Sequence, residues 1–221
     1  MRKRQITLIS KEAQDKLTEA KVAIIGVGGL GSAAAELLAR AGVGKLLLVD
    51  NDIVEECNLG RQFFSKEDIG KSKCLATYEK LQDFTSMEYK VTMLEERNVM
   101  MLQDYDLVLD CTDNMRTRFL INDNCKKWIY AAAIRNQGYV MPIIEGGPCL
   151  RCFLQEKEME SCEEAGVLNV ATTGIAVLQV NLALKTLIYG VDSFLYYLNL
   201  DNMELKKIKV KKSCKKCCYI N

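Results

Sequence analysis

Short apolar runs alternate with amphipathic stretches in the first part of the chain. Lys21–Ile25, Lys45–Asp50, Asp106–Asp110 and Trp128–Ile134 have the length and composition of buried strands. The stretch Tyr89–Leu94 predicts one more strand. Strands that alternate with helices along a chain are typical of an α/β fold with a parallel sheet.

Between these runs, apolar residues recur at the spacing of a helix face. Helices are predicted over Leu75–Leu81 and, after Asp110, through Arg118 and Ile121. The clearest helix follows the first strand, and Gly42 is suited to end it. Strand, glycine turn, helix and strand in this order predict a right-handed parallel crossover. The apolar positions of that clearest helix are Leu30, Ala33, Ala34, Leu37, Leu38 and Ala41.

The pattern changes after Asn136. Gly138–Ile144 predicts an antiparallel strand, and Glu145–Leu168 has no clear period but carries three cysteines. Ala171–Tyr189 predicts a long helix. A hairpin is predicted from 194–200 and 205–210, around Asp201. We therefore predict an α/β fold, with a Rossmann-like, mostly parallel sheet that continues into antiparallel strands.

Composition excludes several classes of function. Lysine plus arginine is 30 and aspartate plus glutamate is 29, so the net charge of +1 gives no reason to expect nucleic acid or a membrane surface as partner. Polar residues interrupt the most apolar window, Val167–Val191, which favours a buried helix over a membrane span. The first residues have no apolar run behind them, so we expect no signal peptide and a cytoplasmic protein.

Ten cysteines and no histidine constrain the chemistry. Without a secretory signal, this cysteine content indicates free thiols or a metal site rather than disulfides. Any zinc ion must be bound by thiolates or carboxylates, and no histidine is available as a general base.

A glycine fingerprint follows the first strand and opens the first helix of the core. It is formed by Gly26, Gly28, Gly29 and Gly31, which let backbone amides approach a phosphate at a helix N-terminus. Asp50 ends the next strand, where a carboxylate can accept ribose hydroxyls. This motif alone favours a nicotinamide-dependent dehydrogenase.

Cations on the following loop argue for a triphosphate. Arg61 and Lys73 come soon after Asp50, and a triphosphate needs its charge neutralised when its α-phosphorus is attacked. Asp113 follows another strand, where its oxygens could hold Mg²⁺ against the phosphates. The alternative is that Asp113 or Asn114 caps the helix that follows, and the two roles are compatible.

Two Cys-x-x-Cys pairs predict a closed, tetrahedral zinc site. Cys149 and Cys152 form one pair, and Cys214 and Cys217 form the other. A zinc ion bound by all four would clip the irregular loop to the C-terminal segment. The alternative is two unrelated pairs of free thiols. Cys162 stands apart from both pairs.

A series of motifs runs through nearly the whole chain: Gly26-x-Gly-Gly-x-Gly31, Asp50-x-Asp52, Asn58-Leu-x-Arg61-Gln62, Gly70-x-x-Lys73, Asp110-Cys-Thr-Asp113-Asn114, Cys149-x-x-Cys152, Cys162-x-x-Ala-Gly-Val167 and Cys214-x-x-Cys217. In these motifs and their order, the chain resembles the ThiF/MoeB/HesA adenylyltransferases, relatives of the ubiquitin-activating enzymes.

The resemblance implies roles for individual residues. Arg4 would reach into the site of the partner subunit in a homodimer. Cys162 would take part in a covalent link with the carrier or in sulfur handling, although a structural loop cysteine is an equal alternative. The residues that the resemblance assigns to ATP, through the motifs just given, are Gly29, Asp50, Asp52, Asn58, Arg61, Lys73, Asp113 and Asn114.

The predicted function is ATP-dependent adenylylation of the C-terminal Gly-Gly carboxylate of a small ubiquitin-like or sulfur-carrier protein. ATP, Mg²⁺ and Zn²⁺ are the expected cofactors, and a separate sulfurtransferase is a further expected partner. We expect one adenylation domain over 1–221, with a nucleotide-binding half (1–136) and a carrier-binding, zinc-containing half (137–221). The alternatives are an NAD-dependent oxidoreductase and a nucleotide-binding adaptor without turnover.

Overall fold

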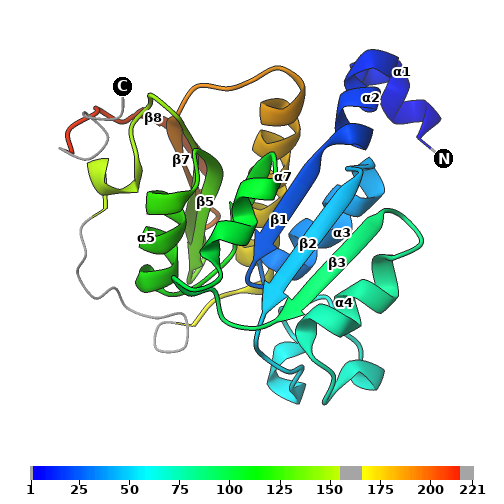
Figure 1. The fold of residues 1–221 in the computed structure, drawn as a ribbon. Helices are drawn as coiled ribbons and strands as arrows, with labels where there is room; N and C mark the ends of the chain where they lie inside the picture. Colours follow the sequence, from blue (N-terminus) through cyan, green and yellow to red (C-terminus); the bar gives the residue numbers. More distant parts are fainter. Residues whose placement is uncertain (1, 155–165, 215–221) are drawn as a thin grey trace.

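One mixed sheet organises the chain (Figure 1). The computed structural model describes residues 2–154 and 166–214. Its eight strands lie in the order β3-β2-β1-β4-β5-β6-β7-β8. They are β1 (Lys21–Ile25), β2 (Lys45–Asp50), β3 (Ser86–Val91), β4 (Leu107–Asp110), β5 (Lys127–Ile134), β6 (Gln137–Ile144), β7 (Phe194–Asn199) and β8 (Glu204–Lys209).

Strand pairing changes from parallel to antiparallel at β5. Strands β3, β2, β1, β4 and β5 run parallel to their neighbours. From β5 onwards each new neighbour is antiparallel, and β5 and β6 form the longest pairing, from Lys127↔Ile144 to Ile134↔Gln137. This confirms the predicted Rossmann-like sheet with an antiparallel continuation.

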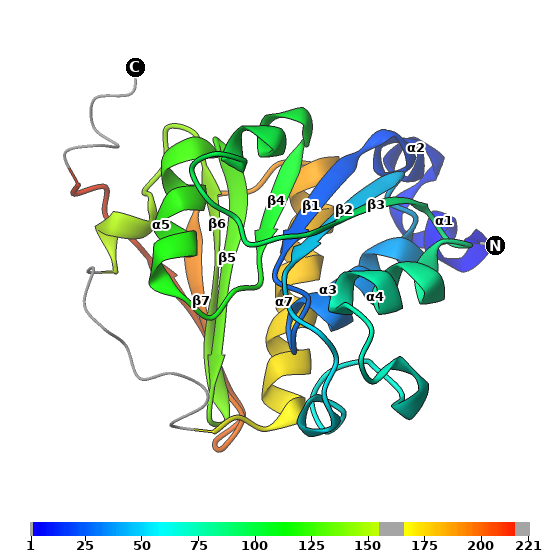
Figure 2. The same cartoon turned by 60° about the horizontal axis from the view of Figure 1, so that its bottom comes forward.

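Helices cover both faces of the sheet (Figure 2). On one face, α3, α4 and α7 pack over Val22, Leu46 and the alternate residues of β4 and β5. On the other, α5 and η3 pack over Ala23, Trp128 and their neighbours. Because successive residues of each strand point to opposite faces of the sheet, one apolar core forms on each face. The helices are α1 (Lys3–Ile9), α2 (Lys11–Glu19), α3 (Gly31–Ala41), α4 (Lys73–Leu81), α5 (Met115–Asn124) and α7 (Asn169–Ile188), with short turns η1 (Glu56–Asn58), η2 (Lys66–Asp68), η3 (Val99–Asp104) and η4 (Leu150–Cys152).

The apolar helix α7 is a core helix of this fold. By length and composition it is the one helix among the described residues that could cross a membrane. It packs against β5, β6 and α3, however, and Ile175, Ala176 and Ala183 are completely buried there. Core packing therefore accounts for its composition.

The predicted strands and helices are confirmed, with one correction. The third strand is β3, Ser86–Val91, and the prediction Tyr89–Leu94 is therefore wrong at both ends. β3 is an edge strand whose residues are mostly exposed, so its hydrophobic pattern is weak. Its position is set by pairing with β2, in which Lys45 is opposite Ser86.

Two helices at the N-terminus were not predicted. Figure 1 shows α1 and α2 beyond the amino end of β1, away from the arrowheads of the parallel strands. The guanidinium of Arg2 donates to the carbonyls of Ala39, Arg40 and Phe84, which fixes the start of α1 to the end of α3. Gly42 ends α3 in the left-handed conformation, as predicted.

Candidate functional site

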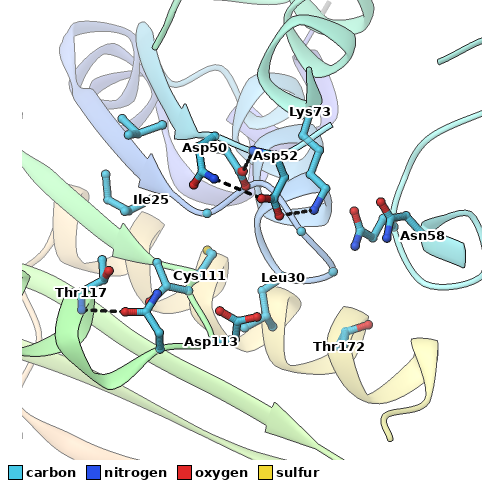
Figure 3. A pocket seen from close by; sticks show the side chains of 18 of the residues that line it. Ile25, Leu30, Asp50, Asp52, Asn58, Lys73, Cys111, Asp113, Thr117 and Thr172 are labelled. Carbon is cyan, nitrogen blue, oxygen red and sulfur yellow. Dashed lines mark hydrogen bonds and ion pairs between the residues drawn. The ribbon is translucent and has the colours of Figure 1, made fainter. Parts of the chain in front are cut away.

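A cavity of about 380 Å³ lies beyond the carboxyl ends of β1, β2 and β4. After β1 the chain continues to β2 on one side of β1, whereas β4 pairs with β1 on its opposite side. Such a switch point in a parallel sheet leaves a crevice in which ligands bind. Figure 3 shows Asp52 and Lys73 together on one side of the cavity, with Asp113 and Thr172 across from them.

The glycine turn is closely packed at two positions and open at one. Gly26 has φ +85°, and a Cβ there would lie 2.8 Å from the Cys111 carbonyl oxygen. A Cβ on Gly31 would lie 1.9 Å from the Gly26 oxygen. A Cβ on Gly28 would meet nothing closer than the Gln62 amide, at 3.9 Å. Gly28 therefore leaves free space beside the backbone at the start of α3, where an anion is favoured.

Asp50 ties the end of β2 to the glycine turn. Its Oδ2 accepts from the Val27 N–H at 2.6 Å, and its Oδ1 accepts from the Asp52 N–H at 2.8 Å. Each carboxylate oxygen has a second lone pair, so Asp50 can still accept from a ligand hydroxyl. The expected ribose role is compatible with this geometry.

The loop after β2 brings the predicted cations to the cavity. Lys73 begins α4, and its Nζ lies 2.8 Å from the Asp52 carboxylate. Arg61 donates to the Cys57 carbonyl at 3.2 Å and lines the cavity. Asn58 is buried, and its side-chain oxygen accepts from the Glu55 N–H, so it shapes this loop.

The turn after β4 separates the roles predicted for Asp113 and Asn114. Asn114 caps α5, since its side-chain oxygen accepts from the Thr117 N–H at 2.8 Å. Asp113 lines the cavity, and within 2–154 and 166–214 its carboxylate has no hydrogen bond or ion pair. The cap is therefore Asn114, and the Asp113 oxygens are available to a ligand.

A buried polar cluster behind this turn was not predicted. Asp110 is completely buried, and Oδ1 accepts from both the N–H and the hydroxyl of Thr112, at 3.0 and 2.7 Å. Arg118 lies beside it and donates to the Thr112 carbonyl at 2.7 Å. Burial raises the pKa of Asp110, and the Arg118 charge acts in the opposite direction. The sequence signal was an arginine one helical turn after Asn114.

Helix α7 contributes two residues that the sequence did not single out. Thr172 lines the cavity, and its methyl carbon would lie 3.2 Å from a Cβ on Gly29. Gln179 is completely buried, and its amide donates to the carbonyls of Asp110 and Ile129 at 2.8 and 3.0 Å. The C-terminal half thus completes the wall of the cavity.

Arg4 does not line the cavity of its own chain. It lies exposed on α1, which Figure 1 shows beyond the amino end of β1, whereas the cavity is at the carboxyl ends of the strands. Cys162 and Cys217 lie outside the described residues.

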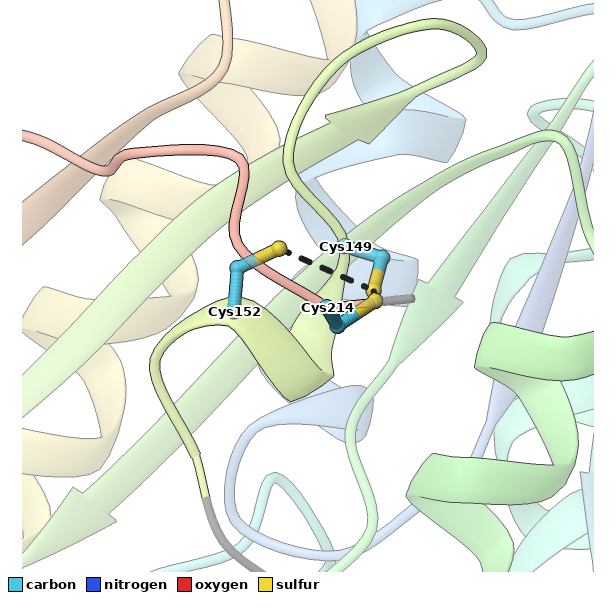
Figure 4. A group of neighbouring side chains, drawn as sticks. All are labelled: Cys149, Cys152 and Cys214. Carbon is cyan, nitrogen blue, oxygen red and sulfur yellow. Dashed lines mark hydrogen bonds between the residues drawn. The ribbon is translucent and has the colours of Figure 1, made fainter. Parts of the chain in front are cut away.

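Three of the four predicted zinc ligands come together (Figure 4). The sulfurs of Cys149, Cys152 and Cys214 all lie within 4.8 Å of one another, and Cys149 lies 3.1 Å from Cys214 and 4.0 Å from Cys152. Thiolates around a tetrahedral zinc ion are about 3.8 Å apart, given Zn–S bonds of about 2.3 Å. The cluster therefore fits a zinc ion that takes its fourth ligand from elsewhere.

Helix α5 supports the turn that carries two of these cysteines. The Leu150 N–H donates to the Asn122 side chain at 2.8 Å, and Arg151 forms an ion pair with Asp123. Burial raises the pKa of Cys149 to about 11, so that thiol keeps its proton at neutral pH unless a cation displaces it.

The other described cysteines are outside this cluster, although Cys57 and Cys111 line the cavity. Cys74 and Cys111 are buried, and burial raises the pKa of both thiols. Cys125 is partly buried, also with a raised pKa, and Cys57 is exposed. Thiols with raised pKa values are poor nucleophiles, so these three are structural.

Sequence comparisons give close relatives. The adenylyltransferase and sulfurtransferase uba4 of Emericella nidulans is 36% identical over 204 residues, which cover 82% of this chain and 42% of the relative. The sulfur carrier protein ThiS adenylyltransferase of Bacillus subtilis is 35% identical over 195 residues, which cover 81% of this chain and 57% of the relative. This chain thus spans roughly half the length of these relatives.

Structural comparison supports the fold. The E. coli MccB structure with ATP matches with a TM-score of 0.80 and 22% identity, over 93% of this chain and 68% of MccB. At this identity the likeness concerns the fold alone. The profile of the ThiF family matches residues 2–219, which is almost the whole sequence. The chain is therefore a member of the ThiF family.

Proposed function

We propose that this protein transfers AMP from ATP to the C-terminal carboxylate of a small ubiquitin-like or sulfur-carrier protein. The observation that carries the proposal is the cavity at the carboxyl ends of β1, β2 and β4. Its walls include an open glycine turn, buried Lys73 and Asp113, whose carboxylate has no partner among the described residues. The names of two relatives, an adenylyltransferase and sulfurtransferase and a ThiS adenylyltransferase, support the same substrate class.

The reaction joins two anions and requires no general base. A carboxylate oxygen of the carrier attacks the α-phosphorus of ATP, and the bond from that phosphorus to the bridging oxygen breaks. Pyrophosphate leaves with the bond electrons, and a carboxyl adenylate remains. The nucleophile is already ionised at neutral pH, which suits a chain without histidine. Catalysis then depends on positioning and on charge stabilisation.

Each wall of the cavity would have its own task. The backbone beside Gly28, at the start of α3, would bind phosphate oxygens. Asp50 would accept the ribose hydroxyls, while Arg61 and Lys73 would stabilise the charge on the phosphates. Thr172 closes the cavity next to Gly29.

The Asp113 carboxylate fits a Mg²⁺ ion. It is a hard oxygen donor on the wall of the cavity, and no described residue engages it. A Mg²⁺ ion held there would neutralise phosphate charge when bound. Asn114 would hold the backbone next to Asp113 through its cap of α5.

A zinc ion would have a structural role in this protein. Cys149, Cys152 and Cys214 would supply three thiolates and Cys217 the fourth, which closes the coordination shell and leaves no position for substrate. The ion would join the turn on α5 to the segment after β8.

We propose a homodimer in which Arg4 acts in the partner's site. Arg4 lies beyond the opposite end of the sheet from the cavity of its own chain, so a role in catalysis requires a second copy. The exposed face of α7 offers an apolar surface for that copy, with Val170 and Val177 about half exposed.

Pyrophosphate exchange is the direct test. The protein is incubated with ATP, Mg²⁺, labelled pyrophosphate and candidate carriers of about 70–100 residues that end in Gly-Gly, a size typical of small domains. Label should enter ATP only with a matching carrier, and a carrier shortened by its last glycine should give none. ATP binding without exchange for any carrier would favour a nucleotide-binding adaptor, and binding of NADH instead of ATP would favour an oxidoreductase.

A further inference from the structure

The buried charges behind the Asp113 turn are not explained by stability. Asp110 is 0% exposed and the side chain of Arg118 7%, with Oδ2 and Nε 3.5 Å apart. Neither of these two atoms has a hydrogen bond to the described residues. A buried ion pair contributes little net stability, because desolvation offsets the attraction. We therefore expect this ion pair to have a role other than stabilising the fold.

The contacts of this pair converge on one residue, Thr112. Thr112 gives its N–H and hydroxyl to Asp110, and its carbonyl accepts from Arg118 Nη2 at 2.7 Å. That carbonyl belongs to the peptide bond between Thr112 and Asp113. By holding this carbonyl, Arg118 fixes the orientation of the peptide plane that joins Thr112 to Asp113.

The other side of Asp113 is held as well. Asn114 is fixed by its bond to the Thr117 N–H, and Arg118 lies on the same first turn of α5. The backbone of Asp113 is thus held on both sides, while its carboxylate lines the cavity without a described partner. An arrangement that fixes the backbone and leaves the side chain open is suited to present a ligand to a cation.

We propose that Arg118 is a positioning residue that acts through Asp113, with Asp110 as its buried counter-ion. Arg118 borders the cavity, but its guanidinium lies 5.3 Å from the centre of the Tyr130 ring and is held by the Thr112 carbonyl and Asp110. It is therefore suited to orient the turn, while Arg61 and Lys73 are the cations proposed for the phosphates. The inference rests on the proposed binding of magnesium and ATP at Asp113.

A double-mutant cycle on MgATP binding tests this inference. Arg118→Lys keeps the charge but lacks the planar fork that reaches both Asp110 and the Thr112 carbonyl. By isothermal titration calorimetry, it should weaken MgATP binding about 10-fold in the otherwise unaltered protein. In the Asp113→Ala background it should change the affinity less than about 2-fold, because the group through which Arg118 acts is gone.

Matched controls separate positioning from folding. Arg116→Lys, on the same helix but 74% exposed, should leave MgATP affinity unchanged in both backgrounds. If Arg118→Lys fails to fold, the double variant Asp110→Asn with Arg118→Met removes both charges and restores stability. It should regain the normal unfolding temperature and still show the weaker affinity.

The outcomes distinguish the inference from the proposed function. Equal loss of affinity in both backgrounds, or normal affinity in the stable double variant, would overturn the role of Arg118 and leave the proposed function intact. No binding of MgATP by the unaltered protein would overturn the proposed function and this inference with it.

Discussion

The ammonium of Lys73 lies 2.8 Å from the carboxylate of Asp52, and the lysine side chain is 8% exposed while that of aspartate is 56% exposed. The cation is thus held inside the wall of the cavity and its counter-ion faces solvent. A triphosphate that enters must share Lys73 with Asp52. The pair keeps a buried charge compensated when no nucleotide is bound.

Replacement of Lys73 should therefore affect catalysis more than that of a neighbouring lysine. Lys73→Met should lower the pyrophosphate-exchange rate about 100-fold, since one pre-placed charge donor is lost from the phosphate site. Lys71→Met is the control, because Lys71 pairs with Asp68 and Glu79 outside the cavity. Equal rates for the two variants would contradict the role of Lys73.

Alanine substitution of two glycines in the same motif should have different effects, one on stability and the other on ATP binding. Gly31→Ala should lower the free energy of unfolding by about 3 kcal/mol, because its Cβ would overlap the Gly26 oxygen. Gly28→Ala should fold normally but bind ATP weakly, because its Cβ fills the space beside the phosphate-binding backbone. Thermal unfolding and calorimetric titration with ATP measure the two effects. Normal ATP affinity in Gly28→Ala would place the phosphates elsewhere.

Substitutions of the adjacent residues Asp113 and Asn114 should have different effects. Asp113→Ala should keep the unfolding temperature, since its carboxylate has no described partner, and should nearly abolish exchange. Asn114→Ala should cost about 1 kcal/mol of stability through loss of the helix cap. Near-normal exchange by a folded Asp113→Ala protein would exclude its proposed magnesium role.

The cysteine cluster should bind about one zinc ion per chain, as four-thiolate sites do. Elemental analysis of protein purified without oxygen measures it. Cys149→Ser should lose both the metal and thermal stability, because the turn on α5 is no longer joined to the segment that carries Cys214. Cys57→Ser is the control, since Cys57 is exposed and outside the cluster. Metal-free protein of unchanged stability would argue for unconnected thiols.

A mixture of two inactive variants should test the trans role of Arg4. Arg4→Ala and Asp113→Ala homodimers should each be inactive, but exchange of subunits creates one intact site per mixed dimer. Random exchange should restore about a quarter of the normal activity, given two equivalent sites in a symmetric dimer. No recovery on mixing, with subunit exchange verified by light scattering of tagged chains, would place Arg4 outside the reaction.

Local sequence signals accounted for the sheet and for the residues that follow its parallel strands. Motifs such as Gly26–Gly31 and Asp110–Asn114 each combine strand, turn and helix start, so their geometry is largely local. Local sequence signals did not predict features whose position depends on tertiary contacts. The exposed edge strand β3 has its position from pairing with β2, and Gln179 reaches Asp110 from far along the chain. A buried glutamine within an apolar helix carries no local indication of its partner.

The bonds of Gln179 to the carbonyls of Asp110 and Ile129 also limit how the polypeptide can be divided. A cut after Asn136 would leave those carbonyls in one fragment and Gln179 in the other, and it would part β5 from β6. Each fragment would expose an apolar surface that the other normally covers. Cleaved at this turn, the protein would serve as a split reporter, whose nucleotide binding returns only when the two pieces reassemble.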